Sequence, residues 1–272
     1  MSDGIGQSYW PGAQGPPPEG KPAKGNRKVI IVALVVAALI VVGMGAAVLA
    51  TRERLEPAPK GTAVSSKPSP KREARPVSPV NCPAPAKPNY QQYSTQFPMR
   101  IDPRNFSYEA RVATNFGEFT IELFATDTPV TVNNFASLAC AGFYNGTLFH
   151  RITTSPSLSV IQGGDATTSD GTGGPGYQFS DELSRAKEGG YPRGVVAMAN
   201  AGPDTNGSQF FIVVHDAELP PHYTVFGEVS SGMSVVDSMY KVGPRGSRDS
   251  RVDGRPRLPI EIESISIVEK AR

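Results

Sequence analysis

The chain has few of the residue types that most bond-breaking chemistry requires. Among its 272 residues are three histidines and two cysteines. No Cys-x-x-Cys pair and no His-x-x-x-His spacing is present, which argues against the usual zinc sites. A Gly-x-Ser-x-Gly elbow and a P-loop ending in Lys-Ser or Lys-Thr are also absent, which argues against a serine hydrolase of that type and a P-loop nucleotide site. We therefore expect no metal and no cofactor.

Positive charge is scarce in the part of the chain that is able to fold. Residues 106–272 hold 13 basic and 19 acidic residues, whereas residues 51–105 hold 10 basic and 4 acidic ones. Eleven of the twelve phenylalanines follow Asn105, so only residues 106–272 are able to bury a large core. A nucleic-acid-binding domain usually carries its basic residues on the folded face, and we therefore expect no nucleic-acid partner.

One long apolar run lies near the N-terminus, where the 22 residues Val29–Ala50 carry no charge. At about 1.5 Å per residue a helix of this length spans about 33 Å, which matches a hydrocarbon core of about 30 Å. A cleavable signal peptide is the alternative, although its apolar core is normally only about 7–15 residues long. Four basic residues precede the run. The length of the run therefore predicts a single-pass membrane helix. The positive-inside rule places residues 1–28, which we expect to be disordered, in the cytoplasm and the C-terminal part outside.

Residues 51–105 are predicted to form a basic, Pro-rich linker. Residues 51–100 contain ten prolines and few large apolar residues, a composition typical of an extended, semi-rigid spacer. Cys82 lies in this linker, and Cys140 lies in the domain that follows it. The two cysteines are compatible with one disulfide in an oxidising compartment, but the sequence leaves open whether they lie close together.

Residues 106–272 alternate short apolar runs with turn residues. Asp127-Thr128-Pro129 is expected to supply the cap and the N1 proline of one helix, which ends at Gly142, and a second helix is expected over Gly232–Val242. The expected strands are Tyr108–Ala113, Glu118–Phe124, Leu148–Ile152, Val160–Gln162, Val195–Ala199, Gln209–Val214, Thr224–Glu228 and Ile260–Val268. This pattern predicts a mainly β domain, a closed eight-stranded antiparallel β-barrel capped by two α-helices.

One arginine is accompanied by amide and apolar side chains that suit the binding of a peptide. Alone, an arginine on a strand is usually a solvated charge or half of an ion pair, and a lone histidine such as His150 is more often structural. Amide side chains bind backbone amides, and apolar residues offer walls for a pocket. The residues concerned are Arg151, Gln162, Asn200, Gln209, Ala199 and Phe211.

Seven short motifs follow one another along this part of the chain. They are Gly117–Leu123 (GEFTIEL), Phe149–Arg151 (FHR), Gln162–Asp165 (QGGD), Gly171–Gly174 (GTGG), Met198–Pro203 (MANAGP), Asn206–Phe211 (NGSQFF) and Thr224–Gly227 (TVFG). In content and order they resemble the cyclophilin peptidyl-prolyl isomerases across most of residues 106–272. The apolar run and the linker lie outside the resemblance and are similar to those of membrane-anchored actinobacterial members.

The resemblance implies catalysis of rotation about Xaa-Pro bonds, with a role for each matching residue. Arg151 would donate a hydrogen bond to the prolyl nitrogen, and Gln162 would orient Arg151 and the substrate carbonyl. Asn200 would hold backbone groups of the peptide, with help from Gln209. Phe211, together with Val160, would form the proline pocket. The other residues expected to line the substrate site are Ala199, Leu158, Ser159, Leu219, Tyr223 and Gly171.

Two parts of the expected pocket depart from the family pattern. The loop before Gln162 is longer than usual, so that Ser159 and Val160 occupy the positions of a Phe-Met pair, with Leu158 as the alternative apolar residue. Leu219 stands where the family has an aromatic residue, and Tyr223 stands where a histidine is common. Loss of one aromatic wall removes about 1–3 kcal/mol of apolar contact. We therefore expect reduced turnover on short peptides and weak cyclosporin binding, and a nanomolar cyclosporin affinity would contradict this expectation.

Two functions are compatible with these features. The first is a monomeric, membrane-anchored isomerase that assists the folding of secreted or envelope proteins. The alternative is a low-activity cyclophilin-like domain that binds Pro-containing segments as a chaperone or scaffold. Retention of Arg151 and its amide neighbours favours the isomerase.

Overall fold

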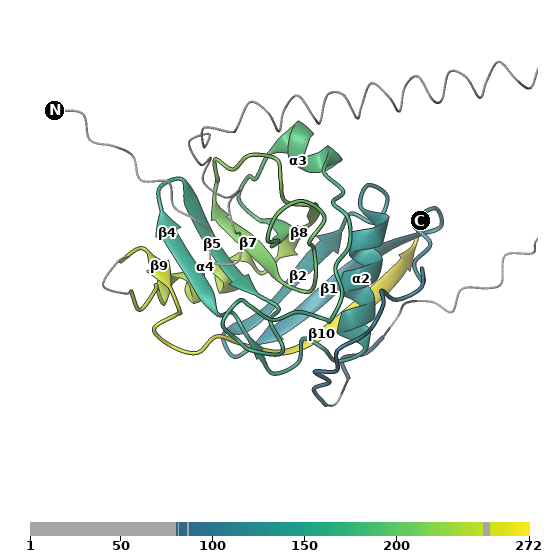
Figure 1. Cartoon of the computed structure of the whole chain (residues 1–272), viewed down its shortest axis with the longest axis horizontal. Helices are drawn as coiled ribbons and strands as arrows, with labels where there is room; N and C mark the ends of the chain where they lie inside the picture. Colours follow the sequence, from purple (N-terminus) through teal and green to yellow (C-terminus); the bar gives the residue numbers. More distant parts are fainter. Residues whose placement is uncertain (1–79, 81, 86, 247–250) are drawn as a thin grey trace, which may run out of the picture. The chain divides into compact units, whose positions relative to one another are not determined.

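The computed structural model describes residues 80, 82–85, 87–246 and 251–272 (Figure 1). The predicted tail of residues 1–28, the predicted span Val29–Ala50 and most of the predicted linker lie outside these residues. No helix within the described ranges is long and apolar enough to cross a membrane. The tail and the span therefore stay predictions.

The described residues form one antiparallel sheet of ten strands, accompanied by three helices. The strands are β1 (Phe106–Thr114), β2 (Gly117–Leu123), β3 (Thr147–Leu148), β4 (Arg151–Ser155), β5 (Leu158–Gly163), β6 (Val195–Met198), β7 (Phe210–His215), β8 (Val225–Ser231), β9 (Asp253–Gly254) and β10 (Glu261–Ala271). The helices are α2 (Pro129–Cys140), α3 (Ser184–Gly189) and α4 (Met233–Lys241). Across the sheet the strand order is β3-β10-β1-β2-β8-β6-β7-β5-β4-β9.

The mainly β, antiparallel prediction is confirmed, but the predicted closed eight-stranded barrel is a curled ten-stranded sheet in the described chain (Figure 1). The two additional strands, β3 and β9, contain two residues each and stand at the two ends of the strand order. The predicted strand Leu148–Ile152 is divided because Leu148 pairs with β10, whereas Arg151 pairs with β5. The helices predicted around 128–142 and 232–242 are α2 and α4, and α3 was not predicted because its six residues carry no long apolar stripe.

The apolar side chains form two clusters because successive residues of a strand point to opposite faces. Phe210 and Ile212 of β7 belong to the larger core, where the Phe210 ring centroid lies 5.6 Å from that of Phe135 on α2. Phe211 and Val213 of the same strand belong to the smaller cluster. Strand β7 therefore carries the main core on one face and a second apolar surface on the other.

The N-terminus of α2 is capped by a distant residue. Thr128 was predicted to take part in the cap, but its hydroxyl donates to the Phe124 carbonyl at 3.1 Å. The Glu182 carboxylate instead accepts hydrogen bonds from the backbone N–H of Val130 (3.1 Å), from that of Thr131 (2.8 Å) and from the Thr131 hydroxyl (2.7 Å). A negative group at this end also favours the helix dipole.

The folded unit begins before Phe106, the start predicted from the sequence. Val80 and Ile101 are 1% and 4% exposed and belong to the main core. Cys82 exchanges two backbone hydrogen bonds with Ile267 of β10, each of 3.1 Å. It also forms a disulfide with Cys140 at the end of α2, with a Cα–Cα distance of 5.6 Å. The C-terminal part of the predicted linker is therefore attached to the domain, because a few apolar anchors and one covalent bond outweigh its Pro-rich composition.

Replacement of Glu182 by alanine is expected to lower the free energy of unfolding by about 1–2 kcal/mol, because two backbone N–H groups at the start of α2 lose their acceptor. Glu182→Gln, which retains one carbonyl oxygen, is expected to lose less. The exposed Glu188→Ala serves as the matched control and should stay within about 0.5 kcal/mol of the native chain. Denaturant unfolding measures all three, and equal values for Glu182→Ala and Glu188→Ala would contradict the cap.

Candidate active site

Three predicted polar residues form a continuous row of hydrogen bonds. Arg151 at the start of β4 is the register partner of Gln162 on β5, and Gln162 is in turn the register partner of Phe211 on β7, two residues after Gln209. Arg151 Nη1 donates to Gln162 Oε1 at 3.2 Å, and Gln162 Nε2 donates to Gln209 Oε1 at 3.0 Å. Three adjacent antiparallel strands thus bring together residues that lie 11 and 47 positions apart along the chain.

The row continues into the glycine-rich loop. Gln209 Nε2 donates to the carbonyl oxygens of Gly171 and Gly173, each at 2.8 Å. Gly171 has a φ of +94°, and a Cβ at this position would lie 3.3 Å from His150 Nε2. The backbone conformation and the close approach both require glycine at position 171.

A buried carboxylate organises this loop. Asp165, which is 0% exposed, accepts hydrogen bonds from five backbone N–H groups. These donors belong to Thr167, Thr168, Asp170, Gly171 and Gly173. Burial alone would raise the pKa of the Asp165 carboxyl, but hydrogen bonds from Thr168, Gly171 and Gly173 outweigh burial and hold the pKa well below its ordinary value. Asp165 is therefore ionised at neutral pH and fixes the position of the loop.

The predicted apolar residues of the pocket meet next to the row, where Gln162 pairs with Phe211. Leu158, Val160, Ala199, Phe211 and Tyr223 all belong to the smaller apolar cluster, and Leu219 packs against it. The Tyr223 ring lies edge-on to the Phe211 ring, with a centroid distance of 5.6 Å. The sheet therefore joins an apolar surface to the hydrogen-bonded row.

Ser159 does not belong to this apolar cluster. Leu158 and Val160 belong to it, whereas Ile161 lies in the main core, as the alternation of β5 requires. The hydroxyl of Ser159 donates to the Ser155 carbonyl at 3.1 Å, within its own hairpin. Of Leu158 and Ser159, Leu158 therefore provides the apolar side chain of the pocket wall. Ser159 stabilises the β4–β5 turn.

A pocket of about 910 Å³ lies beside the row and is lined by Gln162, Gln209, Gly171, Ala199, Asn200 and Gln92, among others. Asn200 Nδ2 donates to the His222 carbonyl at 2.9 Å, and Asn200 Oδ1 accepts from the Gly202 N–H at 3.3 Å. The Asn200 side chain thus ties the wall of the pocket to the loop that carries Leu219 and Tyr223. Gln92 was not predicted, because it lies in the segment interpreted as linker.

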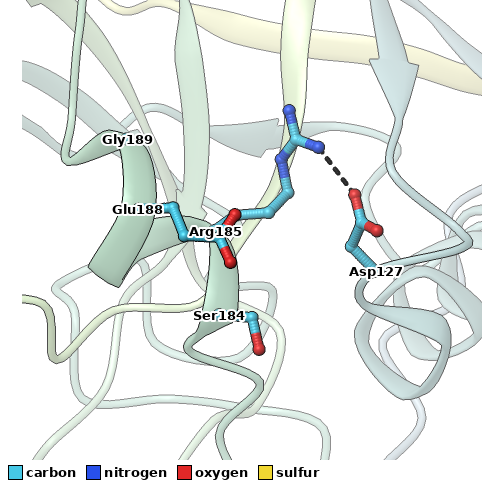
Figure 2. Close-up of a pocket in the computed structure, with 5 residues that line it drawn as sticks. All are labelled: Asp127, Ser184, Arg185, Glu188 and Gly189. Carbon is cyan, nitrogen blue, oxygen red and sulfur yellow. Dashed lines mark hydrogen bonds and ion pairs between the residues drawn. The ribbon is translucent and has the colours of Figure 1, made fainter.

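Another pocket, of about 390 Å³, is lined by Asp127, Ser184, Arg185, Glu188 and Gly189 (Figure 2). Arg185 forms an ion pair with Asp127 at 2.6 Å and lies 3.5 Å from the centroid of the Phe124 ring. Its polar lining makes it a poorer candidate for a peptide site. No group of three or more His, Cys, Asp or Glu side chains in the described ranges is arranged to hold a metal ion.

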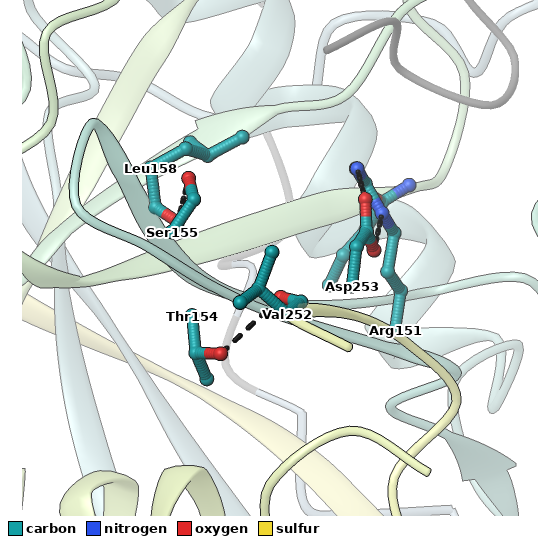
Figure 3. A network of polar contacts seen from close by, with 7 residues as sticks. Arg151, Thr154, Ser155, Leu158, Val252 and Asp253 are labelled. Atoms are coloured by element: carbon teal, nitrogen blue, oxygen red, sulfur yellow. Dashed lines mark hydrogen bonds and ion pairs between the residues drawn. The ribbon is translucent and has the colours of Figure 1, made fainter. Parts of the chain in front are cut away.

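Asp253 on β9 is a residue of this site that sequence reasoning missed. Its carboxylate accepts hydrogen bonds from Arg151 Nε at 2.8 Å and from Arg151 Nη2 at 2.5 Å (Figure 3). Asp253 is 102 residues from Arg151, and a strand of two residues has no recognisable apolar period. The Asp253-Gly254 pair indicates only a turn, so the sequence contains no signal for this contact.

Comparisons with known proteins agree with this geometry. A family model described as cyclophilin type peptidyl-prolyl cis-trans isomerase/CLD matches residues 110–267. Probable peptidyl-prolyl cis-trans isomerase B of Mycobacterium tuberculosis is 41% identical over 201 residues, which are 68% of this chain and 63% of that protein. The Mycobacterium leprae protein of the same name is 46% identical over 177 residues, which are 61% and 58% of the two chains. The chain therefore spans less than two thirds of the length of these relatives.

A crystal structure of a Cryptosporidium parvum cyclophilin type peptidyl-prolyl cis-trans isomerase is similar to the described domain. It is 32% identical and superposes with a TM-score of 0.52, covering 60% of this chain and 99% of that one. The same Cryptosporidium protein, determined in the presence of the dipeptide Ala-Pro, superposes with a TM-score of 0.51.

Acid is expected to destabilise the site through His150. Burial lowers the pKa of this imidazole, and the nearby Asp165 carboxylate opposes the shift. In the unfolded chain the imidazole has its ordinary pKa of about 6.5. The unfolded state then binds the proton first, so the free energy of unfolding falls as the pH drops below about 6.5, by up to about 1.4 kcal/mol per pH unit.

The test compares denaturant unfolding between about pH 7.5 and pH 5.5 for the native chain, His150→Gln and the exposed His215→Gln. His150→Gln should show a smaller loss of stability on acidification than the native chain, and His215→Gln should not. Equal pH dependence of the native chain and His150→Gln would contradict the assignment.

Proposed function

The chain belongs to the cyclophilin-type peptidyl-prolyl cis-trans isomerases, and we propose that it catalyses rotation about Xaa-Pro bonds of polypeptides. The observation that carries this proposal is the row Arg151–Gln162–Gln209 lying beside the apolar cluster of Phe211. One part of the site donates fixed hydrogen bonds, and the other offers an apolar surface to a proline ring.

Rotation about a prolyl bond breaks no covalent bond but must overcome a barrier of about 18–20 kcal/mol, which arises from amide resonance. A hydrogen bond donated to the prolyl nitrogen favours the pyramidal form of that atom, in which resonance is lost. Arg151 is suited to this task because its guanidinium stays protonated and its Nη1 is oriented by Gln162. Such a donor lowers the barrier because it acts on the twisted state more than on the planar one.

The substrate is proposed to be a Pro-containing polypeptide in an extended form. The proline ring is proposed to pack against the cluster of Phe211, Val160 and Leu158, which are 0%, 0% and 5% exposed. Each Å² of apolar surface that the ring removes from water contributes about 25 cal/mol. The neighbouring pocket of about 910 Å³ has room for residues adjacent to the proline. The presence of Ala-Pro with the Cryptosporidium protein supports a dipeptide unit of this kind as the minimal ligand.

The site of action is proposed to be outside the cytoplasm, on secreted or envelope proteins. The apolar run Val29–Ala50, with basic residues before it, supports a membrane anchor with the domain outside. The Cys82–Cys140 disulfide supports the same side, because disulfides persist in oxidising compartments. These two arguments are independent, since one rests on the N-terminal sequence and the other on a side-chain pair in the domain.

Replacement of Arg151 by alanine is expected to lower kcat/KM for a Pro-containing peptide by about 100-fold or more, because one transition-state donor is removed. Arg151→Lys keeps the charge but loses the planar fork, and its rate should be intermediate. The cis-to-trans rate of a short Xaa-Pro peptide measures these effects.

Arg185→Ala is the matched control, since Arg185 forms an exposed ion pair outside the site. It should retain the native rate. Rates for the native chain that equal the uncatalysed rate would refute the isomerase and leave the binding module, which a titration with Ala-Pro peptides then tests. Weak cyclosporin binding by a monomer stays a prediction and is measurable on the same preparation.

The topology is tested with an epitope added after Arg272. In intact spheroplasts of the cells that express the full chain, we expect an antibody to reach this epitope without permeabilisation. An epitope detected only after the membrane is opened would contradict the proposed side. A cytoplasmic marker protein, probed in the same samples, controls for leakage.

A further inference from the structure

Asp253 forms a two-point contact with the residue that the proposed reaction depends on. Its two carboxylate oxygens accept from Arg151 Nε and Nη2, at 2.8 and 2.5 Å (Figure 3). This is the planar arrangement in which arginine binds a carboxylate most specifically. The Asp253 side chain is 23% exposed and that of Arg151 is 8% exposed, so the pair is shielded without being removed from water.

The contact depends on two segments that lie far apart in the sequence. Strand β9 pairs with β4, so that Asp253 stands opposite Thr153 and Gly254 stands opposite Ile152. The Thr154 N–H donates to the Val252 carbonyl at 2.6 Å and extends this pairing by one residue. The Thr154 hydroxyl donates to the same carbonyl at 3.3 Å (Figure 3). The first half of β4, directly after Arg151, is therefore the strand on which Asp253 is held.

The segment that carries Asp253 is also closed at its base. The Arg245 N–H donates to the Arg255 carbonyl at 2.7 Å, and the Arg257 N–H donates to the Gly243 carbonyl at 3.0 Å. Arg257 Nε adds a hydrogen bond of 3.0 Å to the Pro244 carbonyl. Asp253 is thus fixed from both sides, by its own segment and by β4.

The Arg151 guanidinium donates to two different residues. Asp253 occupies the edge formed by Nε and Nη2, and Gln162 accepts from Nη1. Two acceptors on different nitrogens restrain both the plane and the rotation of the group. An unrestrained arginine loses side-chain entropy when it is ordered, and this loss would otherwise add to the barrier of the catalytic step.

From this geometry we propose that Asp253 is a positioning residue for proline rotation, which holds the Arg151 guanidinium in the orientation that donates to the prolyl nitrogen. The inference rests on the proposed isomerase function. Asp253 acts through Arg151 and not through the apolar cluster. Its replacement should therefore lower kcat and leave KM, which reflects proline binding, nearly unchanged. A purely structural ion pair would instead affect stability and leave kcat unchanged.

The test measures kcat and KM of the purified full chain on an Xaa-Pro peptide for Asp253→Ala, Asp253→Asn and Asp253→Glu. Asp253→Ala is expected to lower kcat by about tenfold, in keeping with the cost of a misplaced catalytic group, while KM changes less than about twofold. The isosteric Asp253→Asn keeps an oxygen acceptor and should be intermediate. Asp253→Glu restores the carboxylate and should recover part of the loss.

Asp237→Ala is the matched control, because Asp237 forms a similar ion pair with Arg193 at 2.9 Å, away from the row. It should leave kcat unchanged. A native chain that is active while Asp253→Ala and Asp253→Asn keep the native kcat would overturn the inference and leave the proposed function intact. A native chain without activity would instead refute the proposed function itself.

A spectroscopic measurement tests the positioning without turnover. In chain labelled with ¹⁵N-arginine, the Nε–H signal of Arg151 is identified by its loss in Arg151→Lys. We expect this signal to shift and broaden in Asp253→Ala and to stay unchanged in Asp237→Ala. An unchanged Arg151 signal in Asp253→Ala would contradict the proposal.

Discussion

The site depends on one buried carboxylate, that of Asp165. Its hydrogen bonds to five backbone N–H groups fold the glycine-rich loop, and the loop then presents the carbonyl oxygens of Gly171 and Gly173 to Gln209. Gln209 in turn orients Gln162, and Gln162 orients Arg151. A buried charge is tolerated only when it is fully hydrogen-bonded. The requirement to satisfy Asp165 therefore fixes the loop that accepts from Gln209, while Arg151 is also held by Asp253.

The strands and the polar row follow from short-range signals, which is why sequence reasoning reached them. Alternation along β5 and β7 separates the core face from the pocket face, and the motifs place Arg151 on β4, Gln162 on β5 and Gln209 directly before β7. The sequence did not indicate two features, the cap of α2 and the partner of Arg151, because both depend on contacts between distant segments. Glu182 caps a helix 51 positions away, and Asp253 meets Arg151 across 102 positions. Neither residue differs locally from an ordinary surface carboxylate.

The two departures from the family pattern have different structural outcomes. The longer β4–β5 loop leaves an apolar wall intact, because Leu158 takes the position in the cluster that Ser159 does not. Strand β9 pairs with Ile152 and Thr153 of β4, at the opposite end of β4 from this turn, and brings a carboxylate to Arg151. At Leu219 an aliphatic side chain packs against the cluster, to which Tyr223 also belongs. The longer loop is thus accommodated as a β-hairpin that keeps Leu158 in the cluster, and the Leu219 exchange changes only the apolar side chains that pack against it.

The Cys82–Cys140 disulfide has a mechanical consequence. Residues 83–105 follow Cys82 and include Gln92, which lines the pocket, and Tyr93, whose N–H donates to the Pro175 carbonyl at 2.7 Å. A pull on the chain before Cys82 passes through the covalent bond into α2 and does not load this segment. The segment that contributes Gln92 to the pocket wall therefore carries less of this force.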